Sequence, residues 1–123
     1  MTHKQVINDA AQKILSLVDL IIIVTDEEGI ILEANRSACE LFCYTAEELA
    51  GMPVHLLLPP RYRERHIDAL RQFVTSGETH RRMGQRDSVI GYRKDGALIE
   101  LEAGIAKFHS GGQWILVVNM LDI

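Results

Sequence analysis

Residues 25–51 read TDEEGIILEANRSACELFCYTAEELAG, and the first part of this run predicts a β-hairpin. Gly29 follows three acidic residues and, without a side chain, can adopt the positive φ that a tight turn requires. Apolar segments rich in β-branched residues flank the turn at 20–25 and 30–34, and such residues favour strands. We therefore expect these two segments to pair with each other across Gly29.

The second part of the same run contains two helix starts. Asn35 is a favoured N-cap residue because its side chain can accept a hydrogen bond from a free backbone N–H at the start of a helix. Thr45, followed three positions later by Glu48, matches a capping box. We expect short helices after Asn35 and after Thr45, the second ending near Gly51.

The remainder of the chain predicts one longer helix followed by three strands. Two prolines at 59–60 break the chain before a helical segment at 61–75. The predicted strands lie at 82–92, 97–109 and 113–121, with glycine-containing turns between them. Five strands with helices in the middle of the chain indicate an α+β domain with one antiparallel sheet and helices on one face. The space between the helices and the sheet is then either a pocket or simply core.

The composition limits the classes of function. The chain has 123 residues, of which 47% are hydrophobic, and a net charge of −4, so we expect one domain that does not bind nucleic acid. The segment 61–94 is basic, which suits a small anionic ligand or a partner face. The longest apolar run, at 20–24, is too short for a membrane span. Two cysteines, Cys39 and Cys43, without a recognisable signal peptide predict a cytoplasmic protein.

The N-terminal segment 1–18 has a helical pattern, and we separate it from the main domain at 19–123. Its apolar residues recur at spacings of three and four, which places them on one face of an amphipathic helix. A small domain leaves little sheet surface for a further helix, so we expect a homodimer through this helix face, through a face of the sheet, or through both. The alternative is that the helix folds back on its own sheet. The face consists of Val6, Ile7, Ala10, Ile14 and Leu17.

Several short motifs, taken in order, are similar to those of PAS domains. The resemblance implies a five-stranded antiparallel sheet in the order 2-1-5-4-3 with helices on one face. Cys43 stands where the family usually has glycine, and we interpret it as a residue of ordinary helix or turn geometry. The motifs are TDEEG at 25–29, NRSA at 35–38, LFCY at 41–44, EELAG at 47–51, RKDG at 93–96 and DI at 122–123.

The PAS resemblance also implies a role in signalling. PAS domains are sensory or dimerising modules of histidine kinases, cyclic-di-nucleotide enzymes and transcription regulators. We therefore expect a small molecule or cofactor between the helices and the sheet, and an effector domain in the same polypeptide beyond residue 123. The alternative is a cofactor-free PAS module that serves only dimerisation or docking. The sequence contains no serine-nucleophile, nucleotide-binding or zinc-binding motif, so the chain itself is not expected to be an enzyme.

One segment partly resembles the oxygen-sensing haem PAS domains of the FixL type. Residues 59–66 read PPRYRERH and residues 75–78 read TSGE. The resemblance implies that His66 ligates haem iron and that Arg86, or Asp87 in its place, lies on the oxygen-binding side. The alternative is that His66 is a partly exposed helix residue that binds nothing.

The same resemblance assigns further residues to the candidate pocket. Arg71 and His80, together with Arg81, are candidates to pair with haem propionates, because guanidinium groups suit carboxylates. Ile105 belongs to the same candidate pocket. A flavin photosensor is not expected, because Val54 stands where that class has its reactive cysteine. His66 is thus a predicted metal ligand only if haem is bound.

Overall fold

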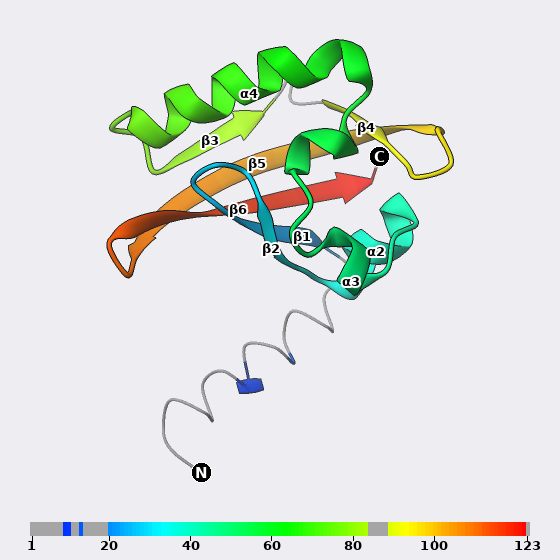
Figure 1. The fold of residues 1–123 in the computed structure, drawn as a ribbon, viewed down its shortest axis with the longest axis horizontal. Coiled ribbons are helices and arrows are strands. Elements are labelled where there is room, and N and C mark those ends of the chain that lie inside the picture. Colours follow the sequence, from blue (N-terminus) through cyan, green and yellow to red (C-terminus); the bar gives the residue numbers. More distant parts are fainter. Residues whose placement is uncertain (1–8, 11–12, 14–19, 84–88, 123) are drawn as a thin grey trace.

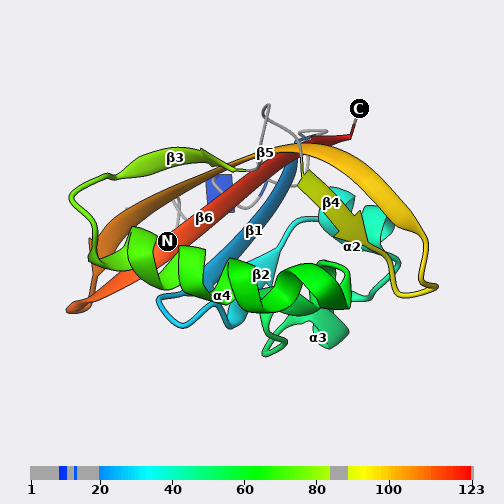
Figure 2. The same ribbon diagram turned by 90° about the horizontal axis from the view of Figure 1, so that it is seen from above.

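The strands form one antiparallel sheet, and the helices lie on one side of it (Figures 1 and 2). The computed structural model describes residues 9–10, 13, 20–83 and 89–122. Within these ranges the strands are β1 (Ile21–Asp26), β2 (Ile31–Ala34), β3 (His80–Met83), β4 (Val89–Tyr92), β5 (Leu98–Ser110) and β6 (Gln113–Asp122). The helices are α2 (Arg36–Phe42), α3 (Ala46–Leu49), the 3-10 helix η1 (Val54–Leu57) and α4 (Pro60–Thr75). The predicted α+β class is confirmed.

The β1–β2 hairpin closes over a turn at 26–29. The Asp26 Oδ1 atom accepts hydrogen bonds from the backbone N–H groups of Glu28 and Ile30, both at 2.9 Å. Gly29 has a φ of +86°, and a Cβ atom there would lie 3.1 Å from His55 Nε2. Gly29 is therefore required both for the left-handed backbone of the turn and for the close approach of His55.

Both predicted helix caps are present. The Asn35 Oδ1 atom accepts the N–H of Ala38 at 3.0 Å, which caps α2, and also the N–H of Ile22 at 3.1 Å. Asn35 therefore ties the start of α2 to strand β1. At α3, the Thr45 side chain accepts the N–H of Glu48, and the Glu48 carboxylate accepts the N–H of Thr45. The capping box predicted from these two residues is confirmed.

The interpretation of Cys43 as ordinary helix or turn is wrong. Cys43 ends α2 in the left-handed conformation, with φ 65° and ψ 37°. Within the described ranges it has the only positive φ of any residue other than glycine. Its N–H bonds to the carbonyl of Cys39, which closes the helix. The position thus requires a conformation that glycine adopts readily and that strains a residue with a Cβ atom.

The predicted five strands and their order 2-1-5-4-3 need correction. The sheet has six strands in the order β2-β1-β6-β5-β3, and β4 also pairs with β5. The difference arises where the sequence predicts one strand at 82–92. Strand β3 ends with Met83 opposite Ala103, and β4 begins with Val89 opposite Leu101. Five residues connect Met83 to Val89, whereas one residue separates Ala103 from Leu101, so one regular ladder cannot run through both segments.

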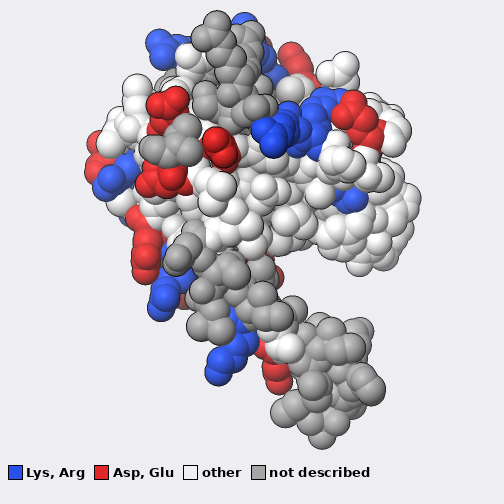
Figure 3. Space-filling model, turned by 180° about the vertical axis from the view of Figure 1, so that it is seen from behind, with Lys and Arg blue, Asp and Glu red and all other residues white. Residues whose placement is uncertain are grey.

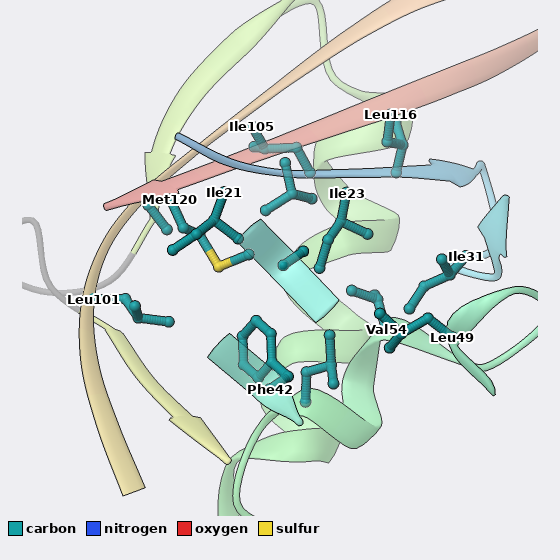
Figure 4. Packing of buried hydrophobic residues seen from close by; sticks show 14 of the residues in the cluster. Ile21, Ile23, Ile31, Phe42, Leu49, Val54, Leu101, Ile105, Leu116 and Met120 are labelled. Carbon is teal, nitrogen blue, oxygen red and sulfur yellow. The ribbon is translucent and has the colours of Figure 1, made fainter. Parts of the chain in front are cut away.

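The hydrophobic core lies between the sheet and the helices (Figure 4). Alternate side chains of β1, β5 and β6 are buried, as the two-residue period of a strand requires. Ile23 and Leu116 from the sheet contribute to the same cluster as Phe42 and Leu49 from the helices. Each of these four is at most 1% exposed. The core therefore fixes the positions of α2 and α3 against the sheet.

The predicted N-terminal helix at 1–18 lies largely outside the described residues. Asp9, Ala10 and Lys13 are described, with helical backbone and exposed side chains. The other members of the predicted dimer face are not described. The homodimer and the domain boundary at 18–19 therefore stay predictions. No helix in the described ranges is long and apolar enough to cross a membrane.

Candidate functional site

A cavity of about 540 Å³ lies between helix α4 and the sheet. Helix α4 runs beside the sheet (Figure 2), and its C-terminal end is bonded to Lys107 of β5. One face of α4 lines the cavity at the spacing of three and four residues that a helix face requires. It presents Tyr62, Arg65, His66, Ala69, Leu70 and Phe73. The other lining residues are Leu58, Arg81, Arg82, Met83, Val89, Ile90 and Ile105.

The position of helix α4 follows from its own sequence. Pro60 occupies the first turn, where a backbone N–H would have no partner within the helix. The Arg63 Nε atom donates to the carbonyl of Leu58 at 2.9 Å, which fixes the entry to the helix. Leu70 and Phe73 are 4% and 1% exposed and hold the second half of the helix on the core. The wall of the cavity is therefore part of a well-anchored element.

His66, which lines the cavity, contacts a second histidine, His55. The Nδ1 atoms of His55 and His66 lie 2.9 Å apart, and the two rings pack edge to face with centroids 5.1 Å apart. At that distance one Nδ1 atom donates a proton and the other accepts it. His55 is buried in η1 and also lies against Gly29. The pair therefore connects the hairpin turn, η1 and α4.

Burial keeps both histidines neutral. Burial lowers the pKa of His66 from its usual 6.5 to about 4, and the neighbouring His55 adds to the shift. Burial also lowers the pKa of His55, with a further contribution from the charge of Arg71. A charged imidazole is disfavoured where little water can solvate it. At neutral pH the pair is uncharged, and Nε2 of His66 is the ring nitrogen that the pair leaves for a ligand.

Lys107 on β5 fixes the other end of α4. Its Nζ atom donates to the carbonyls of Phe73, Val74 and Ser76 at 2.7, 2.9 and 2.7 Å. Carbonyls at a helix C-terminus lack partners within the helix, and an ammonium group has three N–H bonds to offer. Lys107 is only 5% exposed. The end of α4 is thus bonded directly to the sheet.

Sequence reasoning missed His55 and Lys107. His55 meets its partner on α4 only through the fold, and no local motif indicates the contact. Lys107 does carry a signal. Leu101, Ala103 and Ile105 are the buried, inward-facing residues of β5, and Lys107 occupies the next inward position. A charged residue in such a series predicts a buried partner.

The structure brings together two of the five residues predicted for the site. His66 and Ile105 both line the cavity. Arg71 is exposed on α4 and His80 is exposed on β3, and neither lines the cavity. Arg86 lies outside the described residues. Arg81, also named from the sequence as a candidate propionate partner, does line the cavity, together with Arg65 and Arg82.

The wall formed by His66 fits the proximal side of a haem site. Histidines that bind metals are usually held by a hydrogen bond at their other ring nitrogen, and His55 provides such a contact to Nδ1 of His66. A histidine ligand must also be neutral. The lowered pKa of His66 leaves its ring uncharged at neutral pH. The residues predicted for the oxygen-binding side, Arg86 and Asp87, are outside the described ranges.

Comparisons with known proteins identify the family. The family model for the PAS fold matches residues 9–123. The chain belongs to the PAS family. Sensor protein FixL of Bradyrhizobium diazoefficiens is 30% identical over 102 residues, which cover 83% of this chain and 20% of FixL. PAS domains are typically sensory rather than catalytic modules. The identity with FixL supports the resemblance of this chain to FixL that its sequence motifs indicate.

Solved structures show the same fold. The PAS domain of a protein from Colwellia psychrerythraea has a TM-score of 0.80 at 22% identity and covers 95% of this chain and 97% of that one. The PAS domain of a two-component sensor histidine kinase has a TM-score of 0.79 at 11% identity and covers 98% and 100%. The chain spans between 6% and 20% of the length of the curated relatives it matches. This PAS domain is therefore similar to modules of larger signalling proteins.

Proposed function

We propose that this chain is the sensory module of a larger signalling protein and binds a small molecule between α4 and the sheet. The cavity is the observation that carries the proposal. Its volume of about 540 Å³ is within the range of roughly 300–1,000 Å³ for small-molecule sites. Its walls combine apolar side chains with a few polar groups, as such sites do. A cofactor-free docking module is the alternative, and it does not require this space.

The proposed signal passes from α4 to the sheet. Lys107 bonds the end of α4 to β5, and β5 pairs with β6 from Leu101 to Ser110. A ligand shifts an equilibrium between two positions of α4 only by its difference in affinity for the two. We expect this shift to change the position of β5 and β6 and to act on an effector in the same polypeptide.

The test is a thermal-shift screen of small molecules against the wild-type protein and two variants of Ile105. This residue is 4% exposed at the floor of the cavity, so Ile105→Phe reduces the space and Ile105→Val enlarges it. A ligand at 100 times its Kd stabilises the folded protein by about 2.7 kcal/mol. We expect compounds that stabilise the wild type and Ile105→Val but not Ile105→Phe. Equal stabilisation of Ile105→Phe, or no stabilising compound, would favour the docking module.

Haem is a specific candidate for the bound group, and the contact between His55 and His66 supports it. His66 would ligate the iron through Nε2, and His55 would orient the ring. When bound, haem would supply a site for a diatomic gas. We expect the purified protein, incubated with haem, to show a Soret band characteristic of histidine ligation that is lost in His66→Ala and kept in His80→Ala. An identical spectrum for His66→Ala would exclude His66 as the ligand.

A homodimer through the N-terminal face and the outer face of the sheet is also part of the proposal. Alternation along β1, β5 and β6 gives the outer face an apolar set of residues opposite the buried set. Figure 3 shows this side of the molecule, where uncharged residues lie in the centre between groups of charged side chains. The set includes Ile22, Val24, Ile115 and Val117, which are half-buried, and Phe108 and Leu121, which are exposed.

Light scattering of the purified chain tests the homodimer. Phe108 is 50% exposed, and Phe108→Glu places a charge on the outer face that opposes association. We expect a dimer for the wild type and a monomer for this variant. Leu56→Glu, on the helical side, is the control and should remain dimeric. A monomeric wild type would refute the homodimer and leave the cavity proposal unaffected.

A further inference from the structure

The described lining of the cavity contains basic side chains but no acidic ones. Among the described residues that line it, three are arginines and none is acidic. Arg81 is already paired, because its Nε and Nη2 atoms donate to the two carboxylate oxygens of Glu78 at 3.2 and 2.8 Å. Arg82 is exposed on β3 and already has an interaction partner of its own. Arg65 is the arginine that remains.

Arg65 makes no hydrogen bond or ion pair within the part of the chain that the structure describes. It lines the cavity from α4 and is exposed, as is Ala69 one turn further on. Leu70 and Phe73, on the same face of α4, are buried. The cavity therefore has a mouth with an unpaired cation and an interior with apolar walls.

The interior does not favour an ionised group. Ile105 forms part of the floor at 4% exposure, and Phe73 at 1% forms part of the wall. The Nδ1 atom of His66 is taken up by the contact with His55, so its ring offers one remaining nitrogen, Nε2, for a hydrogen bond. A charged group buried there would lose its hydration without gaining an opposite charge. A ligand with an ionised group must therefore place that group at the mouth.

We propose that the occupant of the cavity is an amphipathic carboxylate, with its apolar body in the interior and its carboxylate paired with Arg65 at the mouth. This inference rests on the function proposed above. The planar guanidinium fork of arginine matches a carboxylate with two parallel hydrogen bonds. A free aromatic or aliphatic acid and a haem propionate share this chemistry. The charge at the mouth selects the acid, and the apolar interior supplies the remaining affinity.

Calorimetry with matched ligand pairs tests the inference. The first arm compares 2-naphthoate and decanoate with their primary amides, which keep the apolar body and remove the charge. The second arm compares haem with its dimethyl ester, which distinguishes a porphyrin from a free acid as the source of the carboxylate. Each ligand is titrated into the wild type, into Arg65→Gln, and into Arg71→Gln as a control on the exposed side of α4.

We expect at least one acid to bind the wild type about tenfold or more tightly than its neutral partner, the usual effect of a charge-assisted hydrogen bond. The difference should disappear in Arg65→Gln and persist in Arg71→Gln. A difference that survives in Arg65→Gln would overturn the inference. If acids and amides bind equally and Ile105→Phe weakens both, the inference fails while the proposed function stands. If no acid or amide binds and the thermal-shift screen also finds no ligand, both fail.

Discussion

The first half of helix α4 and its C-terminus are anchored by different kinds of chemistry. In the first half of the helix, His66 meets His55 as a neutral pair that shares one proton. At the far end, the Lys107 ammonium group donates all three of its N–H bonds to backbone carbonyls. Protonation of a histidine or a ligand bound to His66 can change the contact between the two rings. The Lys107 ammonium group has no N–H left for another partner, so a ligand does not compete for it. We call the contact of His66 with His55 the adjustable end of α4, and the contact of Lys107 with the C-terminal carbonyls its fixed end.

The largest expected effect comes from breaking the fixed end. Lys107→Met keeps an apolar stem but removes the ammonium donor from three carbonyls at the α4 C-terminus, of which that of Phe73 keeps the N–H and the hydroxyl of Ser76 as donors. We expect a loss of about 3 kcal/mol in the free energy of unfolding, because unsatisfied buried polar groups are costly. Urea unfolding measures the loss. Lys94→Met is the matched control, since Lys94 is exposed and pairs with Glu48, and its loss should be much smaller. Equal losses would contradict the role of Lys107.

The adjustable end predicts a pH dependence of intermediate size. His66 has a lowered pKa of about 4 in the folded protein and an ordinary value near 6.5 when unfolded. Between these values the unfolded chain binds the proton and the folded protein does not, so stability falls as the pH falls. From pH 7 to about 4.5, we expect the wild type to lose about 2 kcal/mol more than His66→Leu, allowing for partial exposure of the ring.

The comparison of the two ends sharpens this pH test. Urea midpoints of the wild type, His66→Leu and Lys107→Met are measured at both pH values. Lys107→Met should retain the pH dependence of the wild type, because the histidine pair is intact in that variant. If His66→Leu shows the same pH dependence as the wild type, His66 is not held neutral by burial and the two ends do not differ as described.

The smallest expected effect lies away from α4, at a site of backbone strain. Cys43→Gly relieves the left-handed conformation of a residue with a Cβ atom, although glycine adds freedom to the unfolded chain. We expect a net gain of about 0.5–1 kcal/mol in the free energy of unfolding. Cys39→Gly, in the helical part of α2, should instead lose about 1 kcal/mol. A loss in both variants would show that Cys43 is not strained.

Local chemistry explains why the first half of the fold could be predicted from the sequence. The turn at Gly29 and the caps at Asn35 and Thr45 depend on residues within a few positions of each other. Each of these interactions joins residues two to four positions apart, so both partners lie within one short stretch of sequence. The α+β class and the α4 helix followed from the same kind of local pattern.

The second half and the site depend on contacts that local patterns do not contain. The strand predicted at 82–92 is divided, because the register on β5 leaves room for one residue where the chain has five. Arg71 follows His66 by five residues, which places it on the other side of a helix, whereas Arg65 and Ala69 share the cavity face. Helical geometry would therefore have identified Arg65, rather than Arg71, as the arginine of α4 that lines the cavity. No local rule would have paired His55 with His66.

The central claim is that the space beneath α4 admits a small molecule, and xenon tests it most directly. Apolar cavities in proteins bind xenon, and amide chemical shifts of the ¹⁵N-labelled protein under xenon pressure report where the gas enters. We predict saturable shifts at Leu70, Phe73 and Ile105, which line the cavity, and weaker ones in Ile105→Phe. Shifts confined to the outer face of the sheet, or none that saturate, would contradict the claim.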